Sequence, residues 1–376
     1  MAGDGESVNK RDWISVVVLA ALCAALWFVP SAPGVVHDGG VSYRAKVVET
    51  DESQLTLTGF VEYGTQRLKV EMLGGPAAGR RFAASNELRA QLDIDKKFAV
   101  GDVVSVTWPE GGAKDDDVLV ARDHFRLGWI AVLFGAFALL LAVFGGWTGV
   151  KALFSFVFSC FAVWKLLVPL CLQGWNASLT SFATVSLLTA VIMYLVAGAT
   201  RRGVVAFVGA MLGIGSSLAL AELFAAALHV TGATMPFVQA LLYSGFSSLD
   251  LADLFVGATI LASSGAVMDL AMDIAAGICE VRRHNPALGF RELFRSGVRM
   301  GRAVVATITT TLLLAYSGGY LTLLMVFAAQ GTHPLDFLNS TLVSAELVKT
   351  LVGSFGLVLV APFTALVGAW LYGRTD

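Results

Sequence analysis

Residues 265–280 read Gly-Ala-Val-Met-Asp-Leu-Ala-Met-Asp-Ile-Ala-Ala-Gly-Ile-Cys-Glu, and they carry acidic side chains into a region built mostly of apolar residues. Asp269 and Asp273 are four residues apart, so a helix places both carboxylates on one face. Glu280 continues this face, whereas Ile274 points elsewhere. The stretch therefore predicts a helix with one acidic side and one apolar side.

The depth of these acids in a membrane decides between two interpretations. An uncompensated carboxylate at the bilayer centre costs at least ~2.5 kcal/mol, so acids within a span usually face a protein interior or a wet cavity. That cost favours a functional role for Asp269 and Asp273. In the alternative, the span has already ended near Val267 and both acids lie solvated at the cytoplasmic interface.

The composition is that of a polytopic α-helical membrane protein. Of 376 residues, 56% are hydrophobic and only 14% are charged. The net charge of -2 hides a segregated distribution of charge and therefore carries no message about nucleic acid or acidic substrates. No nucleic-acid partner is expected. The four cysteines and five histidines show no metal-ligand spacing, so neither a metal nor a cofactor is predicted.

Eight apolar segments are long enough to cross a bilayer. The first follows Lys10 and Arg11 and is interpreted as an uncleaved signal anchor. The segments are residues 13–29, 127–144, 152–172, 179–199, 204–230, 251–272, 303–329 and 342–372.

Residues 35–122 differ from the rest of the chain because they are charged and their apolar residues alternate. In the segment 66–73, Leu68, Val70 and Met72 alternate with charged residues, which predicts a half-buried strand. Further strands are expected at residues 43–48, 103–108 and 118–121. The sequence therefore predicts a small OB- or SH3-like β-barrel domain. The predicted domains are residues 1–34 (tail and anchor helix), 35–122 (β domain) and 123–376 (membrane domain).

The basic residues predict the topology. With eight spans, Lys10, Arg11, Lys151, Arg201 and Arg374 all share one side, together with the arginines between the sixth and seventh predicted spans. Because basic loops stay in the cytoplasm, both termini are expected inside and the β domain outside.

An amphipathic helix is predicted in the basic loop, residues 282–302. Asn285 is the expected N-cap and Pro286 the first helical residue. Four arginines then follow at helical spacing: Arg291, Arg295, Arg299 and Arg302. The helix is expected to lie at the interface and contact anionic lipid headgroups, or to act only as a topology signal.

Three blocks of sequence resemble the YibE/F-like membrane proteins of bacteria. They are Gly-Ala-Val-Met-Asp-Leu-Ala-Met-Asp-Ile at 265–274, Thr-Thr-Leu-Leu-Leu-Ala-Tyr-Ser-Gly at 310–318, and Ser-Ala-Glu-Leu-Val-Lys-Thr-Leu-Val-Gly-Ser-Phe-Gly-Leu-Val-Leu at 344–359. The resemblance extends from about Phe125 to the end and implies a multi-pass protein of the bacterial cytoplasmic membrane. Thr310 stands where the family usually has Asn, so no role of that amide is carried over. The resemblance implies no biochemical activity.

Several polar residues within the spans are further candidates for an ion or solute pathway. Glu346 and Lys349 are three residues apart and are expected to neutralise each other. Glu222 follows a Gly209-x-x-x-Gly213 close-packing motif in an apolar helix. The full set of pathway candidates is Asp269, Asp273, Glu222, Glu280, Thr310, Glu346 and Lys349.

Two functions of different classes follow. No nucleophile elbow, Walker loop, zinc-protease motif or dinucleotide fingerprint is present, so an enzyme is not predicted. The first hypothesis is a secondary transporter or permease for an ion or small solute. The second is a membrane scaffold or accessory subunit whose β domain binds an envelope protein. Membrane lipids are the other expected partner, and the oligomeric state is left open.

Overall fold

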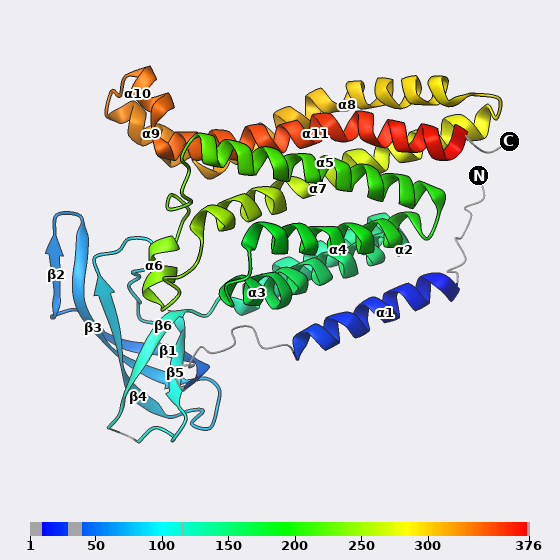
Figure 1. The fold of residues 1–376 in the computed structure, drawn as a ribbon. Coiled ribbons are helices and arrows are strands. Elements are labelled where there is room, and N and C mark those ends of the chain that lie inside the picture. Colours follow the sequence, from blue (N-terminus) through cyan, green and yellow to red (C-terminus); the bar gives the residue numbers. More distant parts are fainter. Residues whose placement is uncertain (1–9, 29–39, 115, 374–376) are drawn as a thin grey trace. The chain divides into compact units, whose positions relative to one another are not determined.

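The computed structural model describes residues 10–28, 40–114 and 116–373. The chain divides into two compact units. One unit is Gly34–Leu140, and the other combines Met1–Pro33 with Leu141–Asp376. The first contains every described strand and the second most of the helices, as Figure 1 shows. The predicted boundary between the anchor helix and the β domain, at residues 34 and 35, lies outside the described residues.

The strands form the predicted barrel. They are β1 (Gly40–Asp51), β2 (Leu55–Thr58), β3 (Val61–Met72), β4 (Arg81–Arg89), β5 (Val103–Pro109) and β6 (Val118–His124). Their order is β1-β5-β6-β4-β3-β2, and a further pairing of β1 with β3 closes five strands into a ring. Only β4 and β6 pair in parallel among the described strands. Of the two expected barrel types, this arrangement fits the five-stranded OB type.

The predicted strands 43–48, 103–108 and 118–121 fall within β1, β5 and β6, and the segment 66–73 overlaps β3 and ends one residue beyond it, whereas β2 and β4 were not predicted. In β4 the inward positions include Ala84 and the amide Asn86, so its alternation of apolar and polar residues is weak. The strand β2 is only four residues long. Both are recognised by their pairing with β3.

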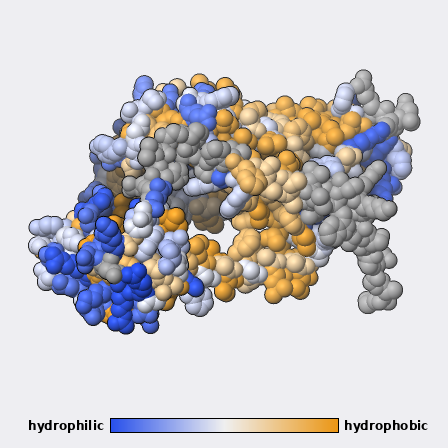
Figure 2. Space-filling model, turned by 90° about the horizontal axis from the view of Figure 1, so that it is seen from below, coloured by the Kyte–Doolittle hydropathy of each residue, from blue (hydrophilic) through white to orange (hydrophobic). Residues whose placement is uncertain are grey.

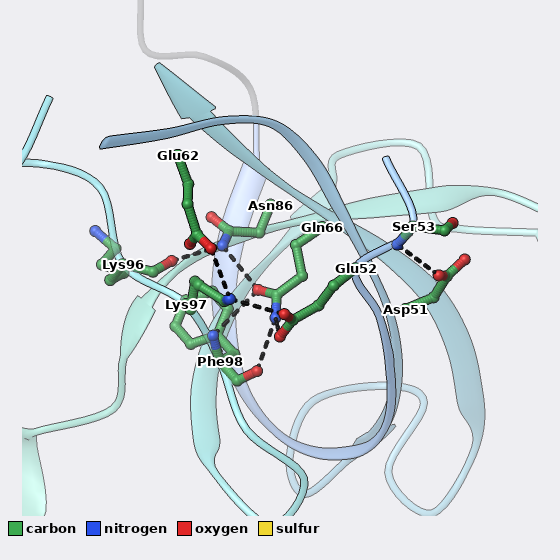
Figure 3. Close-up of polar contacts among 9 residues, drawn as sticks. All are labelled: Asp51, Glu52, Ser53, Glu62, Gln66, Asn86, Lys96, Lys97 and Phe98. Atoms are coloured by element: carbon green, nitrogen blue, oxygen red, sulfur yellow. Dashed lines mark hydrogen bonds and ion pairs between the residues drawn. The ribbon is translucent and has the colours of Figure 1, made fainter. Parts of the chain in front are cut away.

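The buried side-chain amides of Gln66 and Asn86 form hydrogen bonds with the segment that connects β4 to β5, as Figure 3 shows. The Gln66 side chain on β3 is 0% exposed; its Nε2 donates to the Phe98 carbonyl (2.8 Å) and its Oε1 accepts from the Phe98 amide (3.1 Å). Asn86 Nδ2 donates to Gln66 Oε1 at 3.1 Å and to the Lys96 carbonyl at 2.7 Å. These bonds hold the buried Phe98 ring in the barrel core.

The helices account for most of the rest of the chain. They are α1 (Lys10–Trp27), α2 (Leu127–Ala162), the π-helix η1 (Val163–Leu167), α3 (Val168–Leu172), α4 (Ala177–Ala197), α5 (Arg201–Ala227), α6 (Val238–Tyr243), α7 (Leu251–His284), α8 (Phe290–Gly319), α9 (Leu321–Ala329), α10 (Pro334–Asn339) and α11 (Thr341–Gly373). Figure 2 shows hydrophobic residues over the helices and hydrophilic residues gathered over the strands.

Six helical stretches among the described residues are long and apolar enough to cross a membrane, so the predicted count of eight is not confirmed. The predicted segments 127–144 and 152–172 lie in one 46-residue stretch that is interrupted at Gly146 (φ 53°, ψ -135°). The other difference is α1, which is not among the six stretches. It is helical, but its 18 residues include three charged ones, Lys10, Arg11 and Asp12.

Small residues bring α5, α7 and α11 close together, and these helices run side by side in Figure 1. A Cβ added at Gly213 of α5 would lie 2.9 Å from the Val360 Cβ and 3.1 Å from the Val267 Cγ1. One turn away, a Cβ at Gly209 would meet the Thr364 side chain. The predicted Gly-x-x-x-Gly motif therefore packs α5 against α11 and α7.

The basic loop differs from its prediction, because α8 begins at Phe290 and continues without a break into the membrane span. The predicted N-cap at Asn285 was wrong. The Asn285 side chain instead accepts from the Ala287 amide in a turn, and Gly289 precedes the helix with its amide bonded to Glu292. The residues Leu293, Gly297 and Gly301 are buried. On the exposed side lie Arg291, Arg295, Arg299 and Arg302. The segment is amphipathic, but it is the first part of a long helix and not a separate one.

Candidate functional site

The acidic and apolar faces of α7 are separated as predicted. Asp269, Asp273 and Glu280 are exposed within the unit. The apolar residues between them are at most 1% exposed: Leu270, Ile274 and Ile278. Among the described residues, neither Asp269 nor Asp273 makes a hydrogen bond or an ion pair. Two unpaired carboxylates thus lie one helical turn apart.

The neighbouring helix α4 gives the position of these acids along the bundle. Asn176, the N-cap of α4, donates to Asp253 in the first turn of α7, and the Thr189 hydroxyl donates to Met268 Sδ at 3.1 Å. The two helices therefore run in the same direction. At 1.5 Å per residue, Asp269 lies about 24 Å and Asp273 about 30 Å beyond Asp253 along the helix.

A bilayer core is about 30 Å thick, so the stretch from Asp253 to Asp273 is about as long as such a core. Both acids lie in the second half of this stretch, on the side where α4 ends. The two interpretations of their depth in a membrane stay predictions.

An open strip of small and acidic residues runs along α7. We call it the acidic strip; it consists of Ala258, Ala262, Gly265, Asp269 and Asp273, all of which are exposed. A Cβ built at Gly265 would meet nothing within 4 Å.

Other helices cover the two sides of the acidic strip. On one side, Gly257 packs against Ser181 of α4; on the other, Gly277 packs against Met300 of α8. The acidic strip therefore lies in the space between α4 and α8.

A cavity of about 410 Å³ adjoins the acidic strip. Its wall is formed by η1, α3, the start of α4 and the start of α7, and Ala258 belongs to both cavity and strip. No local sequence pattern indicates this cavity, because its walls come from segments far apart in the chain. Its acidic residues, Asp250 and Asp253, lie at the start of α7. Their position in the sequence is typical of a helix start and does not indicate a cavity beside them.

The predicted pair Glu346 and Lys349 forms an ion pair on α11, with 2.8 Å between Lys349 Nζ and Glu346 Oε1. The ammonium group also lies over the Phe255 ring, 5.5 Å from its centroid. The sequence-based expectation that the two charges neutralise each other agrees with this contact. The pair is on the half of the bundle where α7 and α11 begin, away from Asp269 and Asp273.

The remaining candidates do not join the aspartate pair. Glu222 is exposed near the end of α5 and is close enough to Asp253 for their charges to repel. Glu280 lies beside His284 (3.2 Å) and Arg283 (4.0 Å) at the end of α7. The Thr310 hydroxyl donates to the Ala306 carbonyl of its own helix at 3.0 Å. The structure thus does not bring the seven candidates together in one site.

The described part of the chain brings no three histidine, cysteine or acidic side chains together in a way that could hold a metal ion. What the acidic strip offers chemically is negative charge and carboxylate oxygens in an open space. Such groups accept a proton or attract a cation.

Residues 133–374 match the family model described as YibE/F-like protein. The chain belongs to the YibE/F-like family. Searches of curated proteins and of solved structures found no match. The matched region begins within α2 and ends after α11, so it contains all the candidate acids and excludes the barrel. The family resemblance expected from the sequence is confirmed, and the chain is a helical protein with apolar spans suited to a membrane.

Proposed function

We propose that this YibE/F-like chain is a secondary transporter or permease that moves an ion or small solute across the bacterial cytoplasmic membrane. The observation that carries the proposal is the unpaired state of Asp269 and Asp273 on the acidic strip. Carboxylates at this position are costly unless water or a cation reaches them. A chain without a pathway would be expected to pair them, as it pairs Glu346 with Lys349.

The spacing of the two carboxylates supports a role in moving a cation. When both are charged, carboxylates one turn apart repel each other, so a shared proton or bound cation relieves the repulsion. Release of that cation restores the repulsion. The pair can therefore alternate between a loaded and an unloaded state as the strip is exposed to either side.

Flux into proteoliposomes, screened over ions and small solutes at several pH values, tests this proposal. The double variant Asp269→Asn, Asp273→Asn keeps side-chain size and hydrogen bonding but removes charge. We expect it to insert normally and to lose flux or the pH dependence of flux. Thr310→Ala is the matched control, because Thr310 bonds only its own helix, and it should keep most of the flux. Wild-type flux with unchanged pH dependence in the double variant would contradict the proposal.

The proposed orientation has both termini in the cytoplasm and the barrel outside. It is supported by the basic residues at the C-terminal end of α7 and the start of α8, which favour the cytoplasmic side. A reporter fused after Gly112 should be active outside, and one fused after Asn285 inside. Activity of both reporters on one side would refute this orientation.

A second candidate function is a scaffold or accessory subunit in an envelope process, and an exposed apolar patch on the barrel favours it. Leu57, Phe60 and Leu92 are exposed around a hollow of about 210 Å³, with Phe60 84% exposed. Exposed apolar patches of this kind often bind proteins. Neither candidate function involves catalysis.

Site-specific photo-crosslinking in cells distinguishes this second function. A crosslinker at Phe60 should give a discrete adduct with an envelope protein, whereas one at Val41, also exposed on the barrel, should not. Equal labelling at both positions would argue against a specific partner.

A further inference from the structure

The cavity beside the acidic strip has the size of a small-molecule site. Its volume of about 410 Å³ is within the range of about 300–1,000 Å³ typical of ligand pockets. The buried residues Leu167, Cys171 and Ala177 form a small core cluster of their own, packed with Val163 and Leu254. All five line the cavity. An apolar ligand would complete this cluster.

One buried polar side chain also lines this space. Ser181 lines the cavity and is only 3% exposed. Its hydroxyl oxygen lies close to Gly257 of α7, where an added Cβ would come within 2.5 Å of it. The wall of the cavity between α4 and α7 is therefore tightly packed.

The polar rim of the cavity is acidic and held in position. The Asn176 side chain accepts from the Leu179 amide at 2.9 Å while it donates to one oxygen of Asp253. Asp250 accepts from the amides of Ala252 and Asp253, so it is fixed as the N-cap of α7. Both carboxylates therefore have fixed positions at the rim.

The charged side chains that line the cavity, Asp250 and Asp253, are both acidic. None of the described residues that line it is basic. Glu222 adds a third negative charge near Asp253. The exposed ring of Trp175 stands at the lining and offers a π-face, which attracts organic cations.

We propose that this cavity binds a lipophilic organic cation, with the apolar body among Leu167, Cys171 and Leu254 and the cationic centre beside Asp253 and Asp250. An anion of the same shape would meet only negative charge. A neutral apolar molecule would leave the rim carboxylates uncompensated. The acidic strip begins at the same cavity, through Ala258.

Equilibrium dialysis of the purified full chain in detergent tests the proposal, with empty micelles as the background. The probes are tetraphenylphosphonium and tetraphenylborate, which have nearly the same shape and opposite charge. We expect saturable binding of the cation only. Asp253→Asn should weaken it at least tenfold, and Ala258→Phe should abolish it by filling the cavity. Asp336→Asn, which removes an exposed acid from the first turn of α10, is the matched control and should bind normally.

A second measurement avoids variants of the rim. With Cys23, Cys160 and Cys279 replaced by serine, the remaining Cys171 reports on the cavity, which it lines. Tetraphenylphosphonium should slow alkylation of Cys171 by N-ethylmaleimide at least fivefold, and tetraphenylborate should not. Equal binding or equal protection by the two ions, or the absence of saturable cation binding, would overturn the proposal. Neither assay needs flux, so its failure is distinguishable from failure of the transport proposal.

Discussion

Among single residues of the barrel, Gln66 is held in place by several buried hydrogen bonds. It satisfies both backbone groups of Phe98 and also accepts from Asn86. An aliphatic residue at this inward position would satisfy the alternation of β3 equally well, so the pattern of the strand does not reveal the need for an amide. The amide is needed because it forms the hydrogen bonds to Phe98 in the β4–β5 connection.

Replacing Gln66 by alanine should therefore destabilise the barrel strongly. Gln66→Ala leaves the buried Phe98 amide and carbonyl unpaired, and such groups cost about 1–3 kcal/mol each. We expect the free energy of unfolding to fall by about 3 kcal/mol in urea titrations followed by circular dichroism. Gln54→Ala, at an exposed position, should change it by less than about 0.5 kcal/mol. Equal effects of the two changes would contradict this account.

Asp123 links the stability of the barrel to pH. Burial raises the pKa of this carboxyl, but hydrogen bonds from the His124 amide, Lys96 and Arg126 outweigh burial and lower the pKa below its ordinary value. Because the pKa is lower in the folded state, the stabilisation is present above the unfolded pKa of about 3.9. It is lost as pH falls through the folded pKa.

The expected result is a melting temperature of the β domain that falls as the pH is lowered from 5 to 2.5. Part of that fall should disappear in Asp123→Asn, which cannot titrate. Asp93→Asn serves as the control. Asp93 is exposed and does not share the hydrogen bonds described for Asp123, so this variant should retain the full pH dependence. Identical pH profiles for the wild type and Asp123→Asn would show that another group is responsible.

At the scale of elements, α7 is built for two environments. Its apolar face packs into the bundle while its acidic strip remains open between α4 and α8. This division explains why helix spacing alone predicted which residues point inward. The helix α8 shows the opposite case. The spacing of its arginines in the sequence predicted its exposed face, but that spacing did not indicate how long the helix is. Gly297 and Gly301 rest on Ala365 and Ala361 of α11, and this packing continues the helix through the basic segment.

Close packing of α5 predicts that Gly213 cannot carry a large side chain. In Gly213→Leu the new atoms would collide with Val360 and Val267, and overpacking of this kind costs about 1–3 kcal/mol. A lower melting temperature of the purified protein in detergent is expected. Gly265→Ala faces open space on α7 and should not lower it. Unchanged melting of Gly213→Leu would argue against this α5–α11 contact.

At the scale of the whole molecule, the two units have different sources of stability. The barrel has its own core, including Val47, Val70, Phe82 and Val106, whereas the helices bury their apolar residues in a separate cluster. The strands are therefore not expected to need the helices or lipid to fold.

Residues 35–126 alone should form a soluble β domain. The fragment ends at Arg126 because this residue pairs with Asp123 at 2.7 Å. A β-type circular dichroism spectrum with a cooperative thermal transition is expected. A fragment that ends at residue 117 lacks β6, which pairs with both β4 and β5, and should not fold. A helical or unfolded spectrum of the longer fragment would contradict the independence of the barrel.

The sequence by itself determined the features that depend on neighbours within one element. The four-residue spacing of Asp269 and Asp273 places them on one face of any helix, and the alternation around Leu68 makes a strand. The family blocks are likewise continuous stretches. These signals are local because the backbone geometry of helices and strands repeats every few residues.

Only the tertiary structure decided which distant residues meet. Pairing of β1 with β3 closed the barrel, and packing against α11 extended α8 through the arginines. The cavity brings Cys171, Asn176 and Asp253 together from three segments, and no local pattern records the space between them. Such contacts depend on how side-chain volumes fill the gaps between elements, which is a property of the assembled bundle and not of any one stretch of the chain.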